Sequence, residues 1–121
     1  MALLRVLLID DEEELVFTLT ERLMLRGIEV EGVTSGADAI KCVQEKNFDV
    51  VVLDIKMPGI GGLEVMKRIR REQPTIKFIL MTGRGSPEEG EEGMQEGAFA
   101  YLVKPINIED LIKKMMEAVR V

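Results

Sequence analysis

Residues 6–15 read VLLIDDEEEL, four aliphatic residues followed by five acidic residues and a leucine. A continuous aliphatic run of this kind is typical of a parallel β-strand that is buried on both faces of its sheet. The acids begin where the run stops, so Asp10 and Asp11 are predicted to lie at the carboxyl end of that strand. The densest negative charge of the chain would therefore sit at one edge of a sheet.

The same alternation of apolar strand and amphipathic helix continues along the chain. Strands are predicted at residues 3–9, 28–33, 49–53, 76–81 and 99–103. Helices are predicted at residues 11–26 and 35–46, between Gly62 and Pro74, after the cap sequence Ser86-Pro87-Glu88-Glu89, and after Asn107. Five strand–helix units are too few for an eightfold barrel. The fold class is therefore α/β, an open, doubly wound, five-stranded parallel sheet with five helices, in one domain spanning residues 1–121.

The last two predicted helices differ in their apolar stripes and in their glycine content. The final helix carries the clearest apolar stripe of the chain, formed by Ile108, Leu111, Ile112, Met115, Met116 and Val119. The helix before it contains Gly90 and Gly93, each less favourable than alanine by roughly 1 kcal/mol, and few apolar residues beyond Met94. We expect residues 87–96 to form a marginal, mobile helix.

Composition excludes several classes of function. The formal net charge of -6 argues against non-specific binding to nucleic acid or anionic lipid. No apolar run approaches the ~20 residues of a membrane span, and the N-terminus does not resemble a signal peptide. Cys42 is the single cysteine, so an internal disulfide is excluded and a cytoplasmic location is expected. The chain contains no histidine, which excludes Ser–His and Cys–His nucleophile pairs.

Polar residues follow four of the predicted strands. They are Asp10 and Asp11 after the first, Asp54 after the third, Thr82 after the fourth and Lys104 at the end of the fifth. Parallel strands place these ends at one edge of the sheet, where open α/β sheets bind their ligands. Glu12, Glu13 and Glu14 are explained more simply, as acids that favour the positive end of the next helix.

The charges of this group predict a metal ion. Asp10, Asp11 and Asp54 carry three negative charges and Lys104 one positive charge, which leaves two negative charges in one cleft. A divalent cation balances that sum. Oxygen ligands suit Mg²⁺, with Mn²⁺ as a substitute.

Four segments together resemble the receiver domain of two-component response regulators. They are the acid pair Asp10-Asp11, the segment VVLDIKMPGIGGLEV, the strand end LMTG and the strand AYLVKP. The resemblance covers essentially the whole chain, with every segment in order. It implies a CheY-like, flavodoxin-like sheet with strand order 2-1-3-4-5.

The resemblance also implies a role for each residue at the sheet edge. Asp54 would be the phosphoacceptor. Asp11 and Asp54 would bind Mg²⁺ together with the backbone carbonyl of Lys56, while Asp10 would act through metal-bound water.

The phosphoryl oxygens would be bound by Lys104, by the hydroxyl of Thr82 and by the backbone N–H of Gly83. Thr82 would move toward the phosphoryl group and leave space for Tyr101, as in the Thr/Tyr coupling of the family. The alternative for Tyr101 is a half-buried strand aromatic. Pro105 would follow a cis peptide bond by resemblance, although trans is far commoner from sequence alone.

Lys56 and Arg84 stand two residues after Asp54 and Thr82, at positions that tune phosphoryl lifetime in this family. Neither side chain can orient an attacking water as a carboxylate or amide would, so slow autodephosphorylation is expected. The alternative is a pair of solvated surface charges.

By resemblance the phosphodonor is a phosphohistidine on a sensor histidine kinase or phosphotransfer protein, and a downstream output domain or protein would read the switch. No direct contact with nucleic acid or membrane is expected. The chain would be no enzyme beyond its own phosphotransfer and autodephosphorylation. Three alternatives stay open: a Mg²⁺-dependent aspartyl-phosphate phosphatase, a degenerate unphosphorylated module, and a flavodoxin-like cofactor binder. The first usually needs an acid where Lys56 stands, and the last needs a Ser/Thr-rich phosphate loop where the five acids stand.

Overall fold

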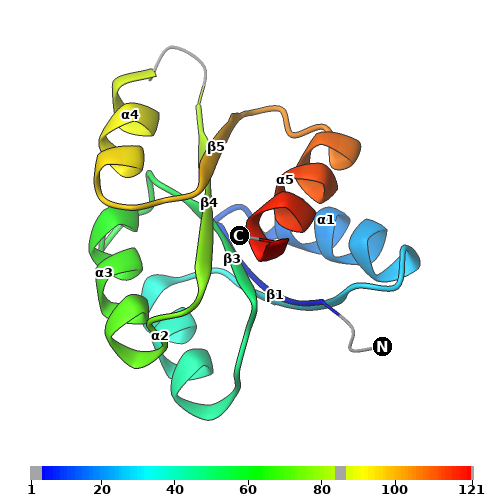
Figure 1. Cartoon of the computed structure of the whole chain (residues 1–121), viewed down its shortest axis with the longest axis horizontal. Helices are drawn as coiled ribbons and strands as arrows, with labels where there is room; N and C mark the ends of the chain where they lie inside the picture. Colours follow the sequence, from blue (N-terminus) through cyan, green and yellow to red (C-terminus); the bar gives the residue numbers. More distant parts are fainter. Residues whose placement is uncertain (1–3, 84–86, 121) are drawn as a thin grey trace.

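The computed structural model describes residues 4–83 and 87–120 and contains one five-stranded parallel sheet (Figure 1). The strands are β1 (Arg5–Ile9), β2 (Glu29–Val33), β3 (Val50–Asp54), β4 (Lys77–Thr82) and β5 (Ala100–Val103). Their order across the sheet is β2-β1-β3-β4-β5, with every neighbouring pair parallel. The predicted fold class and the strand order implied by the resemblance are both confirmed.

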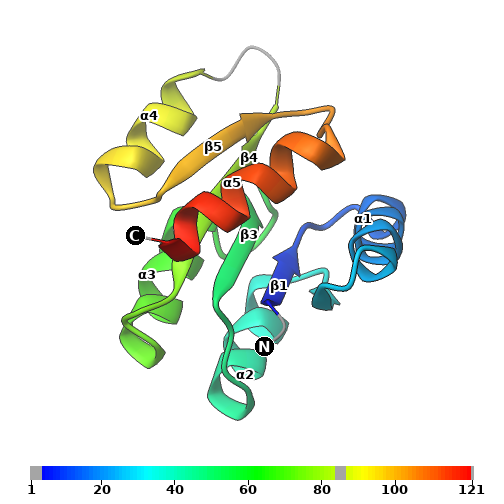
Figure 2. The ribbon, with the colours of Figure 1, turned by 45° about the vertical axis from the view of Figure 1, so that its right-hand side comes forward.

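Five helices connect the strands and cover both faces of the sheet. They are α1 (Glu13–Leu25), α2 (Gly36–Glu45), α3 (Gly62–Glu72), α4 (Pro87–Gln95) and α5 (Ile108–Arg120). Helices α2, α3 and α4 lie on one face, and α1 and α5 lie on the other (Figure 1). Figure 2 shows α5 running along the second face, where Arg26 after α1 pairs with Glu109 of α5 at 3.0 Å. Across the two described segments, no helix is long and apolar enough to cross a bilayer.

The aliphatic runs form strands because consecutive side chains enter two separate cores. In β1, Leu7 and Ile9 join the core under α2 and α3, while Val6 and Leu8 join the core under α1 and α5. All four side chains are fully buried. A strand buried on both faces needs apolar residues at every position, which is why these runs show no alternation with polar residues.

Side-chain caps fix the starts of two helices. The hydroxyl of Ser35 accepts a hydrogen bond from the Asp38 backbone N–H at 3.1 Å, and the amide oxygen of Asn107 accepts one from Asp110 at 3.0 Å. The predicted cap at Ser86 lies outside the described residues. The starts of α2 and α5 therefore agree with the sequence prediction to within one residue.

The predicted apolar stripe of α5 is wrong at two positions. Met116 and Val119 are 45% and 41% exposed. The buried line consists of Ile108, Leu111, Met115 and Ala118. Met116 and Val119 each follow a buried residue, so they point about 100° away from it around the helix. The prediction chose these two residues because they are strongly hydrophobic, and it left out the small Ala118, which is buried.

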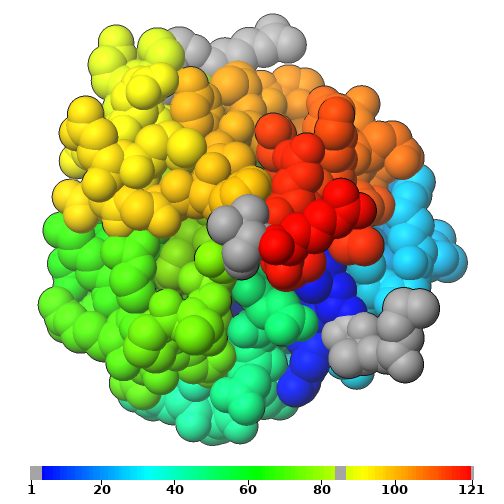
Figure 3. Space-filling model, in the orientation of Figure 1, coloured from blue at the N-terminus to red at the C-terminus, as the bar shows by residue number. Residues whose placement is uncertain are grey.

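The glycines of α4 have a packing role that helix propensity alone does not predict. Gly90 and Gly93 are the buried residues of α4, whereas Met94 is 38% exposed. A Cβ atom at Gly93 would lie 2.0 Å from Cδ1 of Leu80, and one at Gly90 would lie 2.6 Å from the Tyr101 ring. In Figure 3, α4 (yellow) borders α3 (green) on the molecular surface. A residue with a Cβ atom at either position would push α4 away from the sheet or displace Leu80 or Tyr101. The expected mobility of α4 stays a prediction.

Replacing Gly93 with alanine should therefore destabilise the fold, although alanine is the better helix former. The added methyl group meets the fully buried Leu80, and overpacking of this kind costs about 1–3 kcal/mol. Urea unfolding of Gly93→Ala and wild type measures the difference. At the exposed Glu92 in the interior of the same helix, Glu92→Ala should instead be more stable than Glu92→Gly by ~1 kcal/mol. Equal or greater stability of Gly93→Ala would show that the close approach is unimportant.

Candidate functional site

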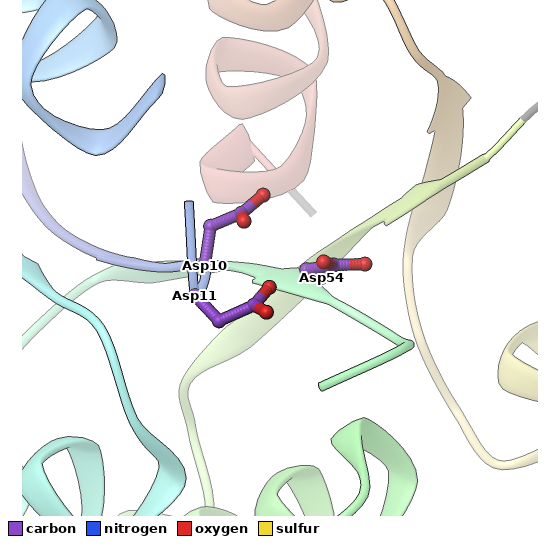
Figure 4. A group of neighbouring side chains, drawn as sticks. All are labelled: Asp10, Asp11 and Asp54. Atoms are coloured by element: carbon purple, nitrogen blue, oxygen red, sulfur yellow. The ribbon is translucent and has the colours of Figure 1, made fainter. Parts of the chain in front are cut away.

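Three aspartates meet at the carboxyl ends of β1 and β3. One carboxylate oxygen from each of Asp10, Asp11 and Asp54 lies within 4.8 Å of the other two. Figure 4 shows the three side chains directed into one space from adjacent strands. Asp10 and Asp54 are buried, whereas Asp11 is exposed. The convergence predicted from the apolar runs is confirmed for these residues.

Lys104, in the segment after β5, brings the positive charge into this cluster. Its ammonium nitrogen lies 2.8 Å from Asp10 Oδ2 and 3.3 Å from Asp54 Oδ2. The contact with Asp10 is an ion pair without good hydrogen-bond alignment, while Asp54 accepts a hydrogen bond. Burial alone would lower the pKa of Lys104, but the contacts with Asp10 and Glu12 and the charge of Asp54 raise it above its usual value. Lys104 therefore stays an ammonium ion.

The carboxyl group of Asp54 is held in an environment that disfavours its charge. Burial is the largest cause that raises the pKa of Asp54 above 3.8, and the negative charge of Asp10 adds to it. Lys104 and the backbone N–H of Lys56, which donates to Asp54 Oδ1 at 3.1 Å, lower the pKa only in part. A cation bound next to Asp54 would offset this unfavourable negative charge, so the site favours cation binding.

Glu12 makes a contact beyond the one predicted for it. As one of three glutamates at the start of a helix, it is predicted to favour the positive end of the helix dipole. In the structure it is the N-cap residue of α1 without a side-chain capping bond, and its Oε1 lies 3.1 Å from the ammonium of Lys104. Glu13 and Glu14 occupy the first turn of α1 as predicted. The apolar runs predict that Asp10 and Lys104 meet, but they do not predict that the side chain of Glu12, 92 positions before Lys104, turns toward it.

Thr82 brings a hydroxyl group to the same edge of the sheet. Thr82 is the last residue of β4, next to β3, and its backbone carbonyl accepts a hydrogen bond from the Lys104 N–H at 2.8 Å. Its side chain is buried, and the hydroxyl has no hydrogen-bond partner within residues 4–83 and 87–120. Gly83 follows it and is exposed. A buried hydroxyl without a partner is rare unless a ligand completes it.

The remaining predicted residues lie around the site. The peptide bond between Lys104 and Pro105 is cis, as the resemblance implied. Tyr101 on β5 is half-buried, and its hydroxyl donates to Glu91 of α4 at 3.4 Å. The ammonium of Lys56 lies 3.8 Å from Glu89 of α4, so the side chain extends toward that helix. Arg84 lies outside the described residues.

Gly62, which the sequence prediction used only to mark the start of a helix, shapes the backbone next to Asp54. A Cβ atom at this position would lie 2.7 Å from the backbone oxygen of Asp54 and 2.6 Å from Cα of Ile55. The Gly62 N–H donates to the Ile55 carbonyl at 2.9 Å. Glycine is therefore required where α3 begins so close to Asp54. A glycine pair before a helix gives no sign of such a contact.

The donor set of the cluster fits a hard divalent cation. Every side-chain donor in it is a carboxylate oxygen, and such ligands favour Mg²⁺ or Mn²⁺ over metals that prefer nitrogen or sulfur. The single thiol of the sequence is not among these donors, because Cys42 lies on α2 and contacts Glu31 at 3.5 Å. Asp10, Asp11 and Asp54 could hold such an ion.

Comparison with known proteins identifies the family. The model of the response regulator receiver domain matches residues 6–116. The chain belongs to the response regulator receiver domain family. Among curated proteins, the transcriptional regulatory protein TcrA of Mycobacterium tuberculosis is 34% identical over 92% of this chain and 44% of its own length. The receiver domain spans about half the length of the curated relatives it matches.

Solved structures agree with this assignment. A response regulator receiver domain protein from Clostridium thermocellum matches with a TM-score of 0.91 and 32% identity, covering 98% of this chain and 95% of its own. A response regulator from Burkholderia pseudomallei matches with a TM-score of 0.86 and 26% identity, covering 97% of this chain and 69% of its own. That structure contains a phosphorylated aspartic acid and a calcium ion.

Removing the charge of Asp54 should stabilise the metal-free receiver domain. An acid whose pKa is raised on folding favours the folded state while protonated, so this contribution is lost as the pH rises above 3.8. We expect Asp54→Asn to be more stable than wild type by about 1 kcal/mol at pH 7 in EDTA, with a smaller difference near pH 4. Urea unfolding at both pH values measures this.

The matched control is Asp38→Asn at an exposed carboxylate in the first turn of α2. Loss of its helix-dipole interaction should lower stability slightly, by about 0.3–1 kcal/mol. A metal-free Asp54→Asn protein that is less stable than wild type at pH 7 would contradict the charge argument.

Proposed function

We propose that this receiver domain accepts a phosphoryl group on Asp54 in a Mg²⁺-dependent reaction and thereby switches its output face. The observation that carries the proposal is the placement of Asp54, a buried carboxylate with a raised pKa, between two further aspartates and an ammonium. The phosphorylated aspartic acid in the Burkholderia pseudomallei relative supports it. Residues 1–121 would act as one domain.

The chemistry follows from the groups present. One oxygen of the Asp54 carboxylate attacks phosphorus as the phosphorus–nitrogen bond of a phosphohistidine breaks, and the imidazole nitrogen leaves with the electron pair. Phosphoryl transfer requires mainly in-line positioning and stabilisation of charge on the oxygens. The hydrogen bonds from Lys56 N–H and Lys104 orient the attacking carboxylate.

Asp11, Asp54 and the backbone carbonyl of Lys56 would hold the metal ion, with Asp10 acting through metal-bound water. Mn²⁺ would substitute for Mg²⁺ because both accept oxygen ligands. When bound, the ion supplies positive charge that offsets repulsion between the carboxylates and the phosphoryl oxygens. The buried Asp10 remains paired with Lys104 and keeps that ammonium at the edge of the site.

The phosphoryl oxygens would be bound from the other side by Lys104, by the Thr82 hydroxyl and by the Gly83 N–H. The unpartnered hydroxyl of Thr82, as described within residues 4–83 and 87–120, supports this role. Movement of Thr82 would then let Tyr101 change position and release its contact with Glu91. Pro105 would hold the loop that carries Lys104. The switch would reach α4 through the ring of Tyr101.

The phosphohistidine of the donor must lie outside residues 1–121, because these contain no histidine. A sensor histidine kinase or a histidine phosphotransfer protein would supply the phosphohistidine, and an output domain or protein would read the switch. The protein would act in the cytoplasm as a signalling module that catalyses only its own phosphotransfer and autodephosphorylation. The aspartyl-phosphate phosphatase is less favoured, since Lys56 stands where such an enzyme needs an acid.

The decisive experiment is incubation with acetyl phosphate and Mg²⁺, followed by intact mass measurement. Wild type should gain ~80 Da, and Asp54→Ala should gain nothing. EDTA should abolish the gain. Asp38→Ala, which removes an exposed carboxylate on α2, should react as wild type does. A mass gain on Asp54→Ala equal to that of wild type would refute Asp54 as the acceptor.

The lifetime of the phosphoryl group should depend on Lys56. We expect slow hydrolysis because neither Lys56 nor Arg84 can orient an attacking water. Lys56→Ala should accelerate loss of the ~80 Da adduct by about two- to fivefold, the range of a solvent-exposed charge contact. Lys67→Ala is the control, because Lys67 also pairs with a glutamate near α4, Glu96 directly after that helix at 3.9 Å, but comes from the middle of α3. Decay within seconds in wild type, unchanged by Lys56→Ala, would contradict shielding.

A further inference from the structure

The ammonium of Lys104 is shared by three carboxylates that differ in their freedom to move. Asp10 and Asp54 are buried at 2.8 and 3.3 Å from it. Glu12 lies at 3.1 Å, but its side chain is 64% exposed. Of these three partners, Glu12 is therefore the one that is exposed to solvent.

This position places a fourth negative charge at the entrance to the site. Asp10, Asp11, Asp54 and Glu12 with Lys104 leave three formal negative charges, and a divalent cation still leaves one. A small phosphodonor is itself an anion and must bring a phosphoryl oxygen to Lys104. Glu12 opposes that approach in two ways: it repels the donor, and it occupies the donor's cationic partner.

We propose that Glu12 slows phosphoryl transfer from small anionic phosphodonors, such as acyl phosphates and phosphoramidates, by pairing with Lys104. This inference rests on the proposed function of Asp54. With acetyl phosphate, the Asp54 oxygen forms a bond to phosphorus as the phosphorus–oxygen bond to acetate breaks, and acetate leaves with the electron pair. Glu12 takes no part in bond making. It acts through its charge and through its contact with Lys104, so it is a positioning residue.

The chain offers a matched control one residue away. Glu13 is exposed in the first turn of α1 and makes no ion pair with the residues that the structure describes. Glu12→Gln and Glu13→Gln therefore change the net charge equally, but only the first removes a partner of Lys104. Since loss of a nearby anion weakens cation binding, each variant is compared at a Mg²⁺ concentration that saturates it.

The test is the second-order rate of the ~80 Da mass gain with acetyl phosphate at low and high salt. Glu12→Gln should react about three- to tenfold faster than wild type in low salt, and Glu13→Gln should stay within about twofold. In 0.5 M KCl the advantage of Glu12→Gln should shrink, because screening weakens exposed charge contacts. Glu12→Asp, with a shorter side chain, should fall between wild type and Glu12→Gln.

A second measurement needs neither metal nor donor. In EDTA, the ammonium protons of Lys104 should exchange with water faster in Glu12→Gln than in wild type or Glu13→Gln, as followed by nitrogen-15 NMR. Equal reaction rates of Glu12→Gln and wild type, or equal effects of Glu12→Gln and Glu13→Gln, would overturn the role of Glu12 while leaving Asp54 as the acceptor. Failure of wild type to gain mass would instead refute the proposed function, and this inference with it.

Discussion

The central constraint in this structure is the burial of two carboxylates beside a single ammonium. Asp10 and Asp54 are nearly inaccessible to solvent, and removal of a charge from water costs several kcal/mol, on the order of the attraction it gains inside. Lys104 offsets part of that cost through its contacts with both. The parallel sheet makes this arrangement possible. It brings the carboxyl ends of β1, β3 and β5 to one edge, although these strands are far apart in sequence.

The compensation is incomplete, and negative charge remains in excess at the site. The pKa of Asp54 remains raised despite Lys104 and the Lys56 N–H, and negative charge exceeds positive charge in the cluster. The hydroxyl of Thr82 is buried without a partner in the part of the chain that is described. Each of these features lowers stability in the isolated domain. A divalent cation and a phosphoryl group would satisfy all three, which fits a site kept for binding rather than for folding.

The sequence predicts the elements that depend on local pattern. It does not predict contacts that depend on the conformation of residues far apart in the chain. The buried strands and their terminal acids follow from uninterrupted aliphatic runs, so Asp10, Asp54 and Lys104 could be placed together in advance. The contact of Glu12 with Lys104 could not, because it depends on how α1 leaves β1 and on one rotamer. The requirement for glycine at position 62 depends on backbone atoms of Asp54 and Ile55 that no local pattern reveals.

The glycines of α4 show how the same residue type can weaken an element and still define its position. In isolation Gly90 and Gly93 lower helix stability. In the fold they remove the side chains that would separate α4 from Leu80 and Tyr101. Because no Cβ atom lies between Gly90 and the Tyr101 ring, a rotation of that ring changes the surface on which α4 packs. Under the proposed switch, movement of the Tyr101 ring would therefore act directly on α4, the helix whose own glycines are predicted to make it marginal.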